Sequence, residues 1–266
     1  MVLRLIIQLF KLNFKTEYIS RFSYLFEILA AGMSLTIYHF TSEAFNSSVN
    51  DSLSLYEMNY FEFIVVGEVL LALPLFFLEG TFRKVKQSLV EGVWETMSYL
   101  NIDSVKAVFY LVLSAVPKEI FKISIVVGLS YLFFDFNVSP LFFLISFIVI
   151  ILISPIFFSL GLLFSLILLR YGRGQSLIGY FLTVMSIGAG SFFPISVLPQ
   201  VVRDIFLFFP YTRALESSRI YIAQSDLYDL SYTIMFIPWF ILFPLSIFIF
   251  KKYTKFKDTN SIVVRV

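Results

Sequence analysis

Six long runs of apolar residues constrain the fold of this chain more than any other feature of its sequence. About 20 apolar residues in a helix are enough to cross the hydrocarbon core of a bilayer. Because lipid offers no partner for backbone N–H and C=O groups, runs of this kind must form helices. The sequence therefore predicts an all-α membrane protein with six transmembrane helices, at residues 22–40, 58–78, 119–134, 140–169, 177–193 and 230–250.

The composition agrees with a protein that lies almost entirely in a membrane. Hydrophobic residues make up 59% of the chain and charged residues only 14%, which lies outside the usual range of soluble domains. A formal net charge of +2 is too small to indicate nucleic acid as a partner. The lack of cysteine excludes thiolate chemistry, and the single histidine, His39, cannot form a multi-histidine metal site.

The basic residues indicate how the bundle is oriented. All but three of the 20 Lys and Arg residues lie on one side of the predicted spans, in segments 1–21, 79–122, 170–173 and 251–265. The other three lie within residues 199–229. By the positive-inside rule, both termini are cytoplasmic. We expect a multi-pass protein of the plasma membrane.

The first 21 residues have the pattern of an interfacial helix. Apolar residues recur three and four positions apart, and charged residues occupy the rest of the helical wheel, as in a helix that lies in the membrane surface. A cleaved signal peptide is the alternative, but charges recur at Lys11 and Lys15 and no small-residue cleavage site follows. We therefore predict an interfacial helix over residues 1–21.

Residues 80–100 predict an amphipathic helix on the cytoplasmic side. Apolar residues recur at steps of three and four, with basic and acidic residues on the other faces. One interpretation is a helix that rests on anionic lipid. The other is a docking element for a cytoplasmic partner, with Glu91, Trp94 and Glu95 exposed beside a break at Gly92.

The stretch from Gly188 to Arg219 does not look like an ordinary span. Its apolar run is interrupted by Pro194 and Pro199 and then becomes charged. A helix broken within a membrane needs protein or water around its freed backbone groups, so we interpret this stretch as part of a pathway or gate. Its three arginines are expected to face outside, where nearby acidic residues can pair with them. The charged residues are Arg203, Asp204, Arg213, Glu216, Arg219 and Asp226.

Two motifs resemble those of the ABC-2-type transporter permeases, the membrane subunits of ATP-binding cassette exporters. The cytoplasmic segment from Gly92 to Ser98, GVWETMS, resembles the G-x-x-E segment of that family. The stretch 188–199 contains a Gly-rich turn followed by F-F-P and L-P, and P-x-T at 210–212 and then Arg219 come after it. This order is similar to the C-terminal signature of the family.

The resemblance implies a single transmembrane permease domain over residues 1–266 that pairs with a second permease, identical or different, and with ATPase subunits. ATP and magnesium would bind to the ATPase, and this chain would hold no cofactor and no metal. Residues 80–100 would form the coupling helix, and residues 194–229 a re-entrant external helical hairpin. The implied coupling residues are Glu91, Gly92, Trp94, Glu95 and Thr96. The implied gate residues are Phe192, Phe193, Pro194, Pro199 and Arg219.

Three glutamates fall within predicted spans. Glu27 and Glu62 lie near the ends of theirs, whereas Glu68 lies well inside. A carboxylate at the bilayer centre costs about 2.5–3.5 kcal/mol on insertion scales. Glu68 is therefore either paired or protonated for structural reasons, or it is part of a translocation path or proton relay.

These patterns favour a non-enzymatic transport subunit that moves a small apolar or amphipathic molecule, lipid or glycolipid outward. The chain contains no G-x-x-x-x-G-K-[ST] motif, so ATP hydrolysis would need a separate chain. An intramembrane enzyme and a non-transporting scaffold or immunity protein of the same fold are the alternatives. Three N-x-S sequons, at Asn46, Asn50 and Asn137, lie on the predicted external side.

Overall fold

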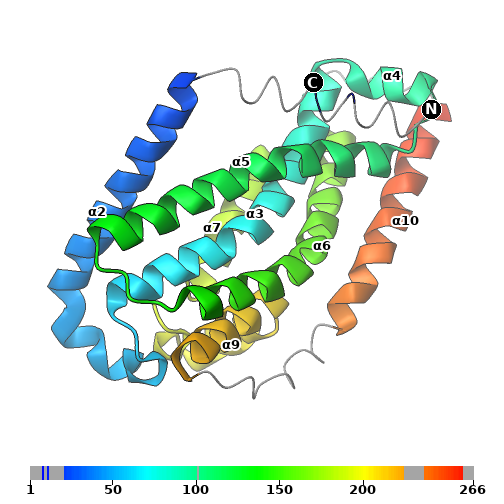
Figure 1. Cartoon of the computed structure of the whole chain (residues 1–266). Helices are drawn as coiled ribbons and strands as arrows, with labels where there is room; N and C mark the ends of the chain where they lie inside the picture. The colour runs from blue at the N-terminus through cyan, green and yellow to red at the C-terminus, as the bar shows by residue number, and fades with distance from the viewer. Residues whose placement is uncertain (1–7, 9–10, 12–20, 101, 225–236, 260–266) are drawn as a thin grey trace.

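The computed structural model describes residues 8, 11, 21–100, 102–224 and 237–259, and every regular element among them is helical (Figure 1). The expectation of an all-α protein is confirmed. The predicted interfacial helix over residues 1–21 falls almost wholly outside the described residues. The elements are α2 (Arg21–Leu53), η1 (Ser54–Tyr56), α3 (Tyr60–Val90), α4 (Val93–Tyr99), α5 (Ser104–Phe133), α6 (Pro140–Tyr171), α7 (Gln175–Gly188), η2 (Ile195–Val197), α8 (Gln200–Leu207), α9 (Pro210–Gln224) and α10 (Ile237–Thr259).

Helix α3 is the centre of the bundle. It packs against α2, α5 and α6, and α6 in turn packs against α9 and α10 (Figure 1). A helix that is apolar on nearly all faces is stable only when other elements surround it, and most side chains of α3 are buried. Both α3 and residues 143–171 of α6 are long and apolar enough to cross a membrane. Both helices can thus span a membrane by length and composition, and α3 is surrounded by its neighbours in the bundle.

Glu62, one of the three glutamates, lies in the first turn of α3 and is hydrogen-bonded there. Glu62 accepts a hydrogen bond from the backbone N–H of Asn59 at 2.9 Å, as part of a capping box. Its other oxygen accepts one from the N–H of Asn137 at 3.1 Å. Glu62 is 7% exposed, and these bonds offset the cost of burying its charge. It fastens the α5–α6 connection to α3.

Several helices extend beyond the predicted spans. Helix α2 continues to Leu53, beyond residue 40, where the first span was predicted to end. Helix α5 begins at Ser104 and passes through Pro117, where the span was expected to begin only at residue 119. Polar residues continue a helix wherever it leaves the hydrocarbon, because water satisfies their side chains. Hydropathy therefore located the apolar part of each helix but not its ends.

The predicted helix over residues 80–100 is two elements. Residues up to Val90 continue α3, a turn follows, and α4 begins at Val93. The continuation is buried, since Phe82, Val85 and even the side chain of Lys84 are nearly inaccessible. The amphipathic pattern that indicated a separate surface helix instead reflects the packing of α3 against its neighbours.

Candidate functional site

The break after α7 is made possible by glycine. A Cβ atom on Gly188 would lie 1.9 Å from the Phe206 ring of α8, so only glycine allows α8 to pack there. Gly190 has a φ of 80°, which glycine adopts without strain. The chain then forms η2, α8 and α9 before α10. The interruption predicted between residues 188 and 199 is thus present as a turn followed by short helices.

Arg219 fixes this break to the bundle. The residue is fully buried, and its guanidinium donates to the carbonyl oxygens of Gly190 at 2.6 Å, Ser191 at 3.0 Å and Phe63 at 2.9 Å. It also lies 3.5 Å from the centre of the Phe63 ring. The expectation that Arg219 faces outside is wrong, because the carbonyls of the broken segment bind it inside the protein.

Gly67 provides the space for this guanidinium. A Cβ atom there would lie 2.2 Å from Nη2 of Arg219 and 2.6 Å from the Ser191 oxygen. Nearby, Tyr56 donates a hydrogen bond to Glu216. A cluster of charged and phenolic groups therefore joins α9 and η1 to the first turns of α3.

The other predicted gate residues differ in how deeply they are buried. Phe192 is half-buried, with its ring 6.3 Å from that of Tyr38. Phe193 is also half-buried and Pro194 is buried, whereas Pro199 is exposed and begins α8. Of these residues, Phe192 lines a cavity within the bundle.

That cavity has a volume of about 340 Å³ and follows one face of α3. The face presents Glu68 at one end and Arg83 at the other, about 22 Å apart at the rise of an α-helix. Leucine, alanine and phenylalanine side chains lie between them, followed by Glu79 one turn before Arg83. We call this cavity the α3 groove. Its lining residues are Tyr38, Glu68, Leu71, Ala72, Leu75, Phe76, Glu79, Arg83, Glu119, Lys122, Ser186, Ser191 and Phe192.

Glu68 has one identified partner in the groove. The Tyr38 hydroxyl of α2 donates a hydrogen bond to its carboxylate. The second oxygen, Oε2, is buried and has no hydrogen-bond partner among the described residues. Glu68 therefore presents a carboxyl group to a polar pocket inside a membrane protein, and its burial is incompletely compensated.

A smaller cavity of about 210 Å³ adjoins the Arg83 end. Lys118 forms an ion pair with Glu27 of α2 at 3.3 Å, and Lys122 pairs with Glu119 at 3.5 Å. These charges lie near the middle of α5, not at its end. The pairing with Lys118 compensates the charge of Glu27 within the bundle. The four charged side chains of the two pairs make this end of the groove polar.

The predicted coupling residues surround a tight turn. Gly92 has a φ of 70° between α3 and α4. Glu91, Glu95 and Thr96 are exposed. Trp94 is not exposed as expected: it is 7% exposed and its ring contacts Phe250 of α10 edge-on at 6.1 Å. The burial of Trp94 orients α4 so that the acidic residues point outward.

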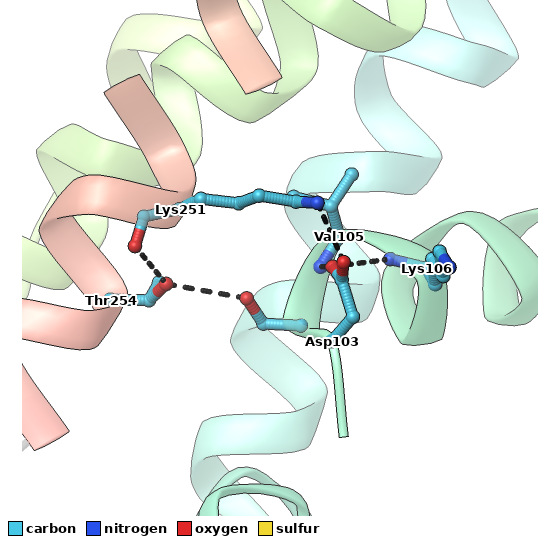
Figure 2. A network of polar contacts seen from close by, with 6 residues as sticks. Asp103, Val105, Lys106, Lys251 and Thr254 are labelled. Carbon is cyan, nitrogen blue, oxygen red and sulfur yellow. Dashed lines mark hydrogen bonds and ion pairs between the residues drawn. The ribbon is translucent and has the colours of Figure 1, made fainter. Parts of the chain in front are cut away.

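A polar network connects the end of this segment to α10 (Figure 2). Asp103 caps α5 by accepting from the N–H groups of Val105 and Lys106, and it pairs with Lys251 at 2.6 Å. Burial raises the pKa of the Asp103 carboxyl, but these donors outweigh it and leave the pKa below its usual value. Thr254 of α10 also lies 3.3 Å from the hydroxyl of Ser104. Segment 93–103 is thus attached to α10 at both of its ends.

Sequence reasoning missed Tyr38, Arg83 and Lys122 as residues of the groove. Positions 68, 72, 75, 79 and 83 lie on one face of a helix, so a wheel that extended the second span to residue 90 would have placed Glu68 and Arg83 together. No sequence signal would have added Tyr38 or Lys122, since they come from α2 and α5.

Residues 104–223 match the family described as ABC-2 type transporter. This match agrees with the resemblance to ABC-2 type transporter permeases seen in the motifs. The match begins at α5 and ends in α9, so it includes the break after α7 but neither the coupling segment nor α3. No curated protein matches the chain in sequence.

Proposed function

We propose that this chain is the membrane-spanning subunit of an ATP-binding cassette exporter. Its cargo is a small apolar or amphipathic molecule, lipid or glycolipid, moved outward by ATP hydrolysis on a separate ATPase subunit. The observation that carries the proposal is the family match over residues 104–223. The α3 groove supports it, because a bundle built only as an anchor has no need of charged residues along its central helix.

In the proposed topology, six helices cross the plasma membrane and both termini are cytoplasmic. The spanning helices are α2, α3, α5, α6, α7 and α10, and η2, α8 and α9 enter the outer leaflet without crossing. The broken backbone of this region is paired within the protein by Arg219, as a re-entrant segment requires. Phe192, Phe193, Pro194 and Pro199 form the external gate.

The proposed ATPase contact is the surface of the turn between α3 and α4. Glu91, Glu95 and Thr96 are exposed there, while Trp94 attaches the element to α10. A partner that binds this surface could therefore move α4 and α10 together. A second permease, identical or different, completes the transporter.

Copurification and transport test this function. The chain, expressed with the ATPase encoded beside its gene, is expected to copurify with it, and vesicles holding both are expected to move a fluorescent lipid only when ATP is hydrolysed. Glu95→Lys should weaken ATPase association without lowering the Tm of the isolated chain, because Glu95 is exposed. Normal association of this variant would remove the proposed contact. Movement of the lipid by the complete complex without ATP hydrolysis would contradict the exporter function.

Glu68 is the candidate residue of the translocation path. Glu68→Gln keeps the shape and the bond to Tyr38 but removes the charge, so transport is expected to fall while expression stays normal. Glu43→Gln, at an exposed position of α2 that lines neither cavity, is the matched control. Unchanged transport by the Glu68 variant would assign this residue a structural role only.

A further inference from the structure

The Glu68 end of the α3 groove carries an acidic group that no described cation balances. The cations of the groove, Arg83 and Lys122, lie at the opposite end, where both also line the smaller cavity. Lys122 pairs with Glu119 at 3.5 Å, Arg83 is attracted to the same carboxylate, and Glu79 lies one turn before Arg83. Glu68, about 22 Å away along the helix, forms no ion pair with a described residue. A cation from outside the chain is therefore attracted to this end.

The hydroxyl groups near Glu68 have acceptor capacity left and no hydrogen to donate. The Tyr38 hydroxyl donates to Glu68, whose Oε2 is buried without a partner among the described residues. Ser191 lies against Gly67 and donates to the carbonyl oxygen of Ser186, whose own hydroxyl donates to a carbonyl of α7. A hydroxyl has one hydrogen and two lone pairs, so each of these oxygens can now only accept. A protonated amine, which has donors and no acceptor, matches this set.

The lining beside these acceptors is aromatic and apolar. The rings of Tyr38 and Phe192 lie 6.3 Å apart, and both residues line the groove. The face of an aromatic ring attracts a cation. Leu71, Ala72 and Leu75 follow along α3, and burial against them stabilises a hydrocarbon group but not a hydrated inorganic ion. The occupant that suits this end therefore combines a cationic group with an apolar part.

We propose that the Glu68 end of the α3 groove binds an amphiphilic amine in its protonated form. The ammonium group lies against the Glu68 carboxylate and donates to the hydroxyl oxygens of Tyr38 and Ser191. The hydrocarbon part occupies the groove along Leu71 and Leu75. Charge-assisted hydrogen bonds of this kind are among the strongest in proteins, and they compensate for a carboxylate placed inside a bilayer. In naming this amine as the cargo, the inference rests on the proposed exporter function.

Binding of octylammonium chloride to the purified full-length chain in a neutral maltoside detergent, measured by calorimetry, tests the site. Glu68→Gln is expected to weaken binding at least about tenfold, the effect of losing one charge-assisted hydrogen bond. Glu43→Gln removes the same charge from an exposed position of α2 outside both cavities and should bind as the wild type does. Glu68→Asp, which keeps the charge on a shorter side chain, should fall between them. Unchanged affinity of Glu68→Gln would refute the site.

Octanol provides a test on the wild-type chain, which does not depend on the folding of a variant. It has the same hydrocarbon part without the charge, so it should bind at least about tenfold more weakly than octylammonium. Equal affinity would show that the groove recognises only the apolar part and would overturn the proposal. Ala72→Phe should fill the apolar part of the groove and weaken octylammonium binding, and unchanged affinity of this variant would refute the groove as the site.

Two competitors distinguish the sources of positive charge. Excess sodium chloride should displace octylammonium no more than choline chloride at the same ionic strength, and a specific effect of sodium would mean an inorganic cation site and overturn the proposal. Dihexanoyl phosphatidylethanolamine carries its ammonium beside a phosphate, for which the Glu68 end has no described cation. It should compete weakly, and competition as strong as that of unlabelled octylammonium would assign the site to a lipid headgroup instead.

This result is independent of the exporter assignment, because binding is measured without an ATPase. If the amine binds but the complete transporter does not move it on ATP hydrolysis, the proposed function fails for this cargo and the binding site stands. If no binding occurs while ATP-driven transport of another molecule is observed, the site is refuted and the exporter stands.

Discussion

Replacement of Arg219 by methionine is the sharpest test of how the broken segment is held. Methionine has a similar length and is apolar, but it donates no hydrogen bond. The substitution would remove the donors that now reach the Gly190 and Ser191 carbonyls, which lie in the turn where helical pairing has ended. It would also remove the contact with the Phe63 carbonyl and ring.

The size of the effect follows from these contacts. Each buried carbonyl left without a donor costs about 1–3 kcal/mol. Removing the buried guanidinium also removes its own desolvation cost, which offsets part of the loss. We expect a net destabilisation of about 3–5 kcal/mol, within the range found when one partner of a buried charged interaction is deleted. At ~2–4 °C per kcal/mol, the Tm should fall by roughly 10 °C.

Thermal unfolding of the purified chain in detergent measures this fall. Arg203→Met is the matched control, because Arg203 lies on α8 and its side chain has no hydrogen bond or ion pair with the described part of the chain. Arg219→Lys keeps the charge but can reach fewer carbonyls, so its Tm should be intermediate. An Arg219→Met variant that unfolds with the wild type would refute the role assigned to this side chain.

Three further predictions concern packing and charge. Gly188→Ala should lower the Tm by displacing α8, and the double variant with Phe206→Leu should recover part of the loss, because the clash is with that ring. Trp94→Ala should lower the free energy of unfolding of this chain by about 3–5 kcal/mol, as for other buried aromatic side chains. The Tm of the separate ATPase should not change. Asp103→Asn should lower the Tm at pH 7 only slightly, because a screened ion pair contributes less than about 1 kcal/mol to the free energy of unfolding. Since the folded pKa of Asp103 is depressed, this stabilisation is present above the unfolded pKa of about 3.9 and is lost as the pH falls through the lower folded pKa, so the two Tm values should converge there. A difference that persists at low pH would contradict the pairing with Lys251.

The location of the break after α7 could be predicted from the sequence because its cause is local. Proline cannot continue the hydrogen bonding of a helix, and Gly188 and Gly190 mark where the backbone turns. The burial of Arg219 could not be predicted in this way. Its partners lie 29, 28 and 156 positions away, and only the packing of α9 on α3 brings them within reach.

Residues 80–100 likewise combine a feature that the sequence predicts with one that only tertiary packing decides. Its apolar spacing indicated a helix, and helices are present, but the spacing alone does not say whether the apolar face meets lipid, a partner or the protein's own core. For Trp94 the answer depends on Phe250, which lies at the far end of the chain. The tertiary structure therefore buried a residue that its local pattern placed on the surface.

The sequence by itself determined that this protein is all-helical and rich in apolar helices, and that its motifs resemble those of ABC-2 type transporter permeases, because hydrophobicity and backbone hydrogen bonding act over a few residues at a time. Tertiary structure alone decided which charges face one another. Glu68 and Arg83 share a face of α3, but Tyr38, Lys118 and Lys122 reach them from α2 and α5. A groove between helices is a property of their packing, and no single stretch of sequence specifies it.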